Sequence, residues 1–143
     1  MIMIWGYIYI ALIVGITLVV LWIGDRECRL AITTLLAGSA LTLGALFFTG
    51  SYFERIDWLM LAIDLAVFAA FLARALVSRR YWPMLLPMFQ AITCATHLTK
   101  LAAPEIVPDA YSAAQGHWSY WQMMIILIAA CYARAEKNTH ERA

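Results

Sequence analysis

Long uninterrupted runs of apolar residues dominate the pattern along the chain. A helix needs about 20 mainly apolar residues to cross a bilayer, with a range of about 17–25. Five segments meet this requirement: Met3–Ile23, Leu30–Thr49, Asp57–Val77, Met84–Ala103 and Trp118–Ala135. The pattern therefore predicts an all-α protein, an integral membrane bundle of five transmembrane helices in which residues 1–143 form a single transmembrane domain.

The positive charges alternate between the two ends of these segments. One side carries Arg55 and Lys100, whereas the other carries Arg26, Arg29, Arg74, Arg79, Arg80, Arg134, Lys137 and Arg142. Lysine and arginine accumulate on the cytoplasmic side of membrane proteins. The charge pattern therefore predicts that the N-terminus is outside and the C-terminus is cytoplasmic.

The longest connection runs from Pro104 to His117, between the fourth and fifth segments. Pro104 and Pro108 prevent continuation of the fourth helix. Within the connection, residues 109–115 are predicted to form a short surface helix that Gly116 ends. This segment is interpreted either as a connector lying at the membrane surface or as a lid or partner-docking loop.

Composition narrows the class of protein and its partners. Hydrophobic residues make up 64% of the chain and charged residues 13%, against about 45–50% and about 25% in soluble domains. The net charge of +1 predicts no nucleic-acid partner. The three cysteines are not arranged as CxxC pairs, so no disulfide framework is expected. We expect the partners to be the lipid bilayer and the protein itself or other membrane subunits.

Small residues recur at helical spacing in the second and third segments. Gly38 and Gly44 lie in the second segment, and Ala62, Ala66 and Ala70 form a stripe on the third. Lipid provides no hydrophobic drive for helix association, so small residues matter because they allow close approach. They predict helix packing, either within the bundle or between subunits.

Four polar residues lie inside the third and fourth segments: Asp64, Gln90, His97 and Lys100. An aspartate at the centre of a membrane helix costs about 2.5–3.5 kcal/mol on insertion scales, so such residues usually face the bundle interior. The short connection Ser78–Pro83 makes the two helices antiparallel neighbours. We therefore predict an interior polar cluster of these four residues in the outer half of the membrane.

The cluster has three interpretations. It can be a satisfied hydrogen-bonded group that fixes helix register, an ion or proton site, or a recognition site for a lipid or small ligand. The second is attractive because a histidine titrates near neutral pH. Cys94 and His97 have i, i+3 spacing but supply only two ligands, so we predict no metal site and no cofactor.

The second half of the chain resembles a family of small polytopic membrane proteins of alphaproteobacteria that have no assigned activity. The resemblance covers roughly Ile63 to Tyr132. It is carried by Arg80, Trp82 and Pro83, then Phe89 and Gln90, then Thr96 and His97, and finally Tyr111, Gln115, Trp118 and Tyr120. It implies a location in a bacterial inner membrane and transfers no catalytic residues.

The sequence contains no GxGxxG, P-loop, HExxH or GxSxG motif, each of which marks a known catalytic or nucleotide-binding site. We therefore expect a non-catalytic inner-membrane protein that acts by association, as a homo-oligomer or as an accessory subunit. The alternative is a small ion or proton channel or transporter whose pathway is lined by the four-residue cluster. A third hypothesis is a membrane enzyme or cofactor carrier that uses His97.

Overall fold

The computed structural model describes residues 2–49, 58–102 and 108–141. These residues form five α-helices and one 3-10 turn, without a β-strand among them, so the all-α prediction is confirmed. The helices are α1 (Ile2–Ile23), α2 (Arg26–Thr49), α3 (Trp58–Val77), α4 (Leu85–Ala102) and α5 (Pro108–His140), and the turn η1 (Trp82–Met84) precedes α4.

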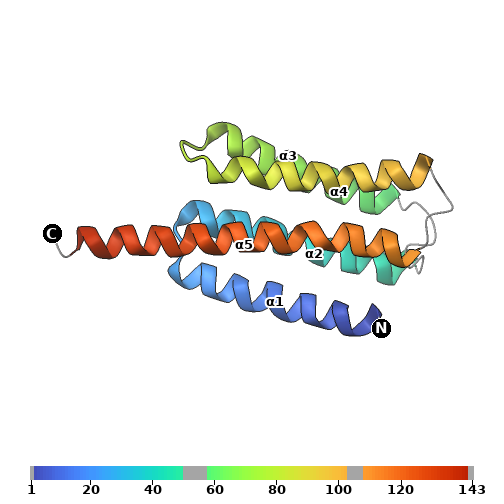
Figure 1. Ribbon diagram of the computed structural model, residues 1–143, viewed down its shortest axis with the longest axis horizontal. Coiled ribbons are helices and arrows are strands. Elements are labelled where there is room, and N and C mark those ends of the chain that lie inside the picture. Colours follow the sequence, from blue (N-terminus) through green and yellow to red (C-terminus); the bar gives the residue numbers. More distant parts are fainter. Residues whose placement is uncertain (1, 50–57, 103–107, 142–143) are drawn as a thin grey trace.

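The helices lie side by side along one long axis (Figure 1). α2 contacts α1, α3 and α5, while α5 contacts α1, α2 and α4, so these two helices form the middle of the bundle. α3 and α4 make an antiparallel pair on one side, and α1 lies on the other (Figure 1). This order places α3, α4 and α5 in succession, with α4 in contact with both neighbours.

The start of α2 is set by a capping side chain. Oδ1 of Asp25 accepts a hydrogen bond of 3.0 Å from the backbone N–H of Cys28, which satisfies one of the amides left free at a helix N-terminus. The helix therefore begins at Arg26 rather than at Leu30, where the apolar run begins.

The prediction for the fifth helix was wrong in its bounds. The structure continues one helix of 33 residues from Pro108 to His140, where a separate surface helix ending at Gly116 and a span over Trp118–Ala135 were expected. Proline is well tolerated at the first helical position, and glycine inside a helix costs only about 1 kcal/mol. The helix is about 50 Å long at 1.5 Å per residue, and its C-terminal end projects beyond the bundle (Figure 1).

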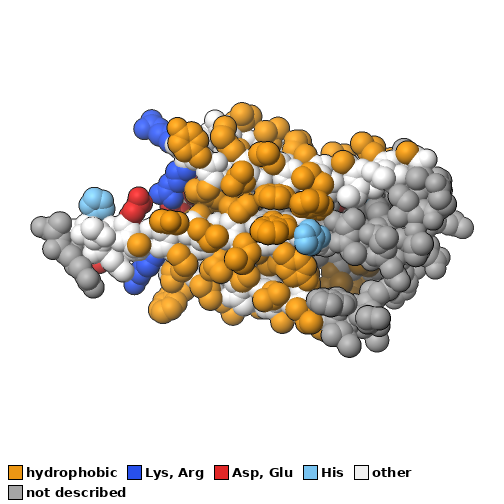
Figure 2. Space-filling model, in the orientation of Figure 1, with side chains coloured by type: hydrophobic (Ala, Val, Ile, Leu, Met, Phe, Trp, Pro, Cys, Tyr) orange, Lys and Arg blue, Asp and Glu red, His pale blue; other side chains and the backbone are white. Residues whose placement is uncertain are grey.

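Three helices, α1, α2 and α3, are each long and apolar enough to cross a membrane. Their outward faces carry large apolar side chains, with Phe48 93% exposed and Leu18 64% exposed. Figure 2 shows hydrophobic side chains across the middle of the visible face and lysine and arginine side chains toward the end from which α5 projects. These features indicate a membrane protein.

The small residues occupy different environments. A Cβ atom at Gly38 would lie 2.6 Å from Cγ2 of Val67, so this glycine permits the close approach of α2 and α3. A Cβ at Gly44 would meet nothing within 4 Å. Ala62 and Ala66 are exposed on α3 and Ala70 is half-buried.

Candidate functional site

An acidic and a basic side chain meet between α3 and α4. Oδ2 of Asp64 lies 2.9 Å from Nε2 of His97, and which atom carries the hydrogen depends on the imidazole tautomer. The His97 side chain is 1% exposed and the Asp64 side chain 16% exposed. Both groups therefore lie inside the bundle, at a hydrogen-bonding distance that permits a proton to be shared.

Gln90 provides a second hydrogen bond to the same carboxylate. Its Nε2 donates to Oδ1 of Asp64 at 3.0 Å. Gln90 and His97 are seven residues apart, which places them on the same face of α4 two turns apart. Gln90 therefore bonds one oxygen of Asp64, and His97, two turns further along α4, bonds the other.

The hydrogen bonds continue from α4 to α5 through Gln122, whose side chain is fully buried. Nε2 of Gln122 donates to Oε1 of Gln90 at 3.1 Å and to the backbone carbonyl of Leu86 at 3.0 Å. Gln122, Gln90, Asp64 and His97 thus form one connected series, which we call the polar chain. It links α5, α4 and α3 through the bundle interior.

The polar chain contains three of the four predicted cluster residues. Asp64, Gln90 and His97 are brought together, whereas the side chain of Lys100 lies outside the part of the structure that is described. The sequence reasoning missed Gln122. In the sequence, Gln122 is an uncharged amide four residues inside an otherwise apolar segment. Such a residue does not indicate which helix its side chain will face.

A pair of hydroxyl groups joins α1 and α2, away from the polar chain. The phenol oxygen of Tyr9 in α1 is 2.7 Å from Oγ of Ser39 in α2. The Tyr9 ring also packs edge to face against Tyr120 of α5, with ring centres 5.5 Å apart.

A separate group of polar residues joins the start of α2 to the connection between α3 and α4. Asp25 forms an ion pair with Arg80, and Oγ of Ser78 donates to Oε2 of Glu27 at 2.9 Å. We call these four residues the connection clamp. Burial raises the pKa of Asp25, but hydrogen bonds from Cys28 and the positive charge of Arg80 outweigh burial and hold this pKa below its ordinary value.

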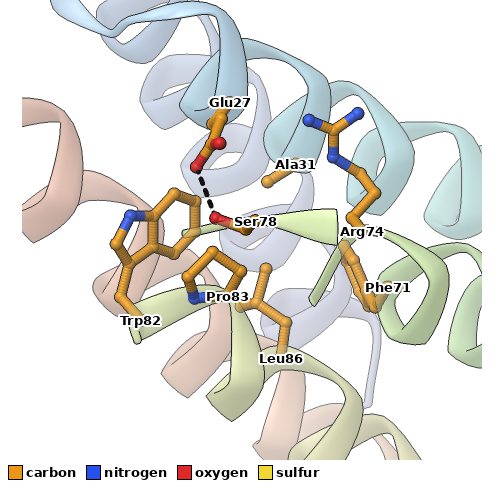
Figure 3. Close-up of a pocket in the computed structure, with 8 residues that line it drawn as sticks. All are labelled: Glu27, Ala31, Phe71, Arg74, Ser78, Trp82, Pro83 and Leu86. Atoms are coloured by element: carbon orange, nitrogen blue, oxygen red, sulfur yellow. Dashed lines mark hydrogen bonds between the residues drawn. The ribbon is translucent and has the colours of Figure 1, made fainter. Parts of the chain in front are cut away.

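A small cavity lies beside Glu27 and Ser78 of the connection clamp (Figure 3). Its volume is about 10 Å³, which is about the lower limit for a cavity that holds one water molecule. Glu27 and Ser78 line one part of the cavity, and Phe71 and Leu86 line the apolar part (Figure 3). Leu86, which lines the cavity, also accepts a hydrogen bond from Gln122 through its backbone carbonyl.

The described side chains contain no group of three or more histidine, cysteine, aspartate or glutamate residues arranged to hold a metal ion. Comparison with known proteins identifies no matching family model, curated protein or solved structure. The resemblance to alphaproteobacterial membrane proteins therefore stays a prediction.

Proposed function

We propose that all five helices cross the bilayer, with the N-terminus outside and the C-terminus in the cytoplasm of a bacterium. α4 packs antiparallel against α3 and also contacts α5. Its 18 residues span about 27 Å, close to the hydrocarbon thickness of about 30 Å. A helix that lies along a spanning neighbour shares its depth, which supports the same role for α4 and α5.

Within this bundle we propose that Asp64 and His97 bind and release a proton, so that the protein acts as a small proton channel or transporter. The observation that carries this proposal is their hydrogen bond of 2.9 Å, which joins a buried imidazole to a partly buried carboxylate. An imidazole changes its charge near neutral pH and a carboxylate can accept the same proton. The pair can thus hold one proton in two positions without a change in helix packing.

Stability alone is a weaker reason for such a pair. Replacement of buried ionic pairs by apolar residues of similar size is often neutral or stabilising, because two charged groups must lose their hydration. Ionisable groups inside membrane proteins commonly mark ion or proton pathways. A role in proton binding therefore explains better than stability why a buried His97 faces a partly buried Asp64.

The test is proton uptake by vesicles that contain the purified protein and a trapped pH-sensitive dye. Asp64→Asn keeps the side-chain shape and removes the charge, while His97→Ala removes the imidazole. Thr99→Ala is the matched control on α4, because Thr99 is exposed and donates a hydrogen bond to the carbonyl of Ala95 on its own helix. We expect uptake to be lost in the first two variants and kept in the control. Equal uptake in all three would refute the proposal.

A second proposed role is association, supported by the outward face of α3. Ala62, Ala66, Ala69 and Ala73 are all exposed, and their spacing of four, three and four residues forms one stripe along the helix. Small side chains permit two membrane helices to approach closely. A two-fold contact would set this stripe against its own copy, so both sides of the contact would be small. We therefore propose that the partner is a second copy of the chain.

Native mass in a mild detergent tests this association. A homodimer has twice the protomer mass of 16.1 kDa. Ala66→Leu should shift the mass to that of one protomer, because the larger side chain separates the two helices. Ala37→Leu is the control, since Ala37 is equally exposed but lies on α2. A dimer that survives Ala66→Leu, or a complex with other polypeptides, would contradict a contact through α3.

A further inference from the structure

The amide of Gln122 has only one orientation that fits its neighbours. Its buried Nε2 faces the carbonyl of Leu86 and Oε1 of Gln90, at 3.0 and 3.1 Å. Both neighbours are oxygen atoms that can only accept, so the nitrogen rather than the oxygen of Gln122 must face them. The backbone carbonyl of Leu86 cannot turn over, and it therefore fixes this choice.

The fixed amide of Gln122 orients the next amide in turn. Because Oε1 of Gln90 accepts the hydrogen bond from Gln122, its Nε2 faces Asp64 and donates to Oδ1 at 3.0 Å. Reversal of Gln90 would set a carbonyl oxygen against the carboxylate and an N–H group against the N–H group of Gln122. The donors thus point in one direction, from α5 toward Asp64.

This direction favours one position for the proton between Asp64 and His97. A hydrogen bond is stronger when its acceptor carries a charge, so the N–H group of Gln90 favours the carboxylate form of Asp64. A carboxylate can only accept, and the hydrogen at the 2.9 Å contact then belongs to Nε2 of His97.

We infer that Gln122 is a positioning residue for the proton site, although it touches neither Asp64 nor His97. It sets the direction of hydrogen bonding along the polar chain and so keeps the shared hydrogen on Nε2 of His97. This inference rests on the proposed role of Asp64 and His97 in proton binding. It adds to that role a residue on a third helix that governs which partner holds the proton.

Nitrogen NMR of protein with labelled histidine tests the inference, because the two ring nitrogens differ in chemical shift according to which carries hydrogen. The chain has three histidines, and His97→Ala identifies the signal of His97. At a pH where the pair holds its shared proton in addition to the hydrogen on Nδ1, we expect both ring nitrogens of His97 to carry hydrogen in the unsubstituted protein, because the carboxylate of Asp64 leaves the shared hydrogen on Nε2. A predominant Nδ1–H form would overturn the inference without any variant at Gln122.

Gln122→Met preserves side-chain length and removes the amide. We expect the ratio of the form with hydrogen on both ring nitrogens to the Nδ1–H form to fall about fivefold, the factor that corresponds to one net hydrogen bond. Thr99→Val should leave the ratio unchanged. A folded Gln122→Met protein with the original ratio would refute the role of Gln122. If the protein lacks proton uptake but shows the ratio change, the transport proposal fails and the positioning role stands.

Discussion

The pairing of Asp64 with His97 makes a quantitative prediction about coupling. Each residue is replaced by alanine, singly and together, and the free energy of unfolding is compared in a double-mutant cycle. The cycle isolates the interaction between the two side chains, because losses that each variant suffers alone cancel. The 2.9 Å contact and the burial of His97 identify this pair as the strongest candidate for coupling in the polar chain.

The expected magnitude follows from the geometry of the contact. Hydrogen bonds that involve a charged group contribute about 1.5–3 kcal/mol in soluble proteins, whereas double-mutant cycles within a membrane protein average about 0.6 and reach about 1.7 kcal/mol. The His97 side chain is almost fully buried and Asp64 is 16% exposed. We therefore expect a coupling energy of about 1–2 kcal/mol, near the upper end of the membrane range.

Reversible unfolding in mixed micelles, followed by tryptophan fluorescence, provides the measurement. The chain has six tryptophans, so each unfolding transition has a strong signal. A parallel cycle of Asp64→Ala with Thr99→Ala is the control, because Thr99 is exposed on α4 and bonds its own helix. The control cycle should be additive. A coupling energy below about 0.5 kcal/mol, the usual non-additivity of distant sites, would refute the paired geometry.

Three further predictions concern other parts of the bundle. Gly38→Ala should lower the free energy of unfolding by about 1–3 kcal/mol, because its Cβ would lie 2.6 Å from a methyl group of Val67. Gly44→Ala is the control in the same micelle assay and should be neutral or stabilising, because its Cβ would meet nothing within 4 Å. Asp25→Asn should destabilise by about 0.5 kcal/mol at pH 7. Because folding lowers the pKa of Asp25, its contribution is present above the unfolded value of about 3.9 and is lost as pH falls further, so unfolding at pH 3 should show a smaller difference. Cys131 is exposed and Cys28 buried, so a membrane-permeant maleimide should label Cys131 before denaturation and Cys28 only afterwards, as mass spectrometry can show.

The contact between α3 and α4 followed from the sequence because two local features determined it. A connection of six residues forces neighbouring antiparallel helices, and helical periodicity then sets Gln90 and His97 on one face. Asp64 had to meet that face, since an exposed carboxylate in lipid is costly. These constraints leave little freedom, and the structure has the expected hydrogen bonds.

The part played by α5 was harder to predict from the sequence. The long connection before it allows the helix to pack in several places, so periodicity alone could not assign Gln122 to α4. Pro108 is also ambiguous, because proline both stops a preceding helix and suits the first position of the next one. The position of α5 depends on packing among distant helices, including its contacts with α1 and α2, which no local pattern encodes.

The connection clamp and the polar chain constrain how the proposed proton site can work. Ser78 and Arg80 follow α3 and bind Glu27 and Asp25 at the start of α2. Asp64 lies 14 residues before Ser78, which is about 21 Å along the helix axis at 1.5 Å per residue. α3 is therefore fixed near both ends, and α4 is joined to it through Gln90 and His97. Rocking of one helix against another would break several of these contacts together. Rotation of the His97 ring leaves the connection clamp and the bond from Gln90 to Asp64 in place, so we expect proton exchange to use side-chain motion and entering water rather than rearrangement of the helices.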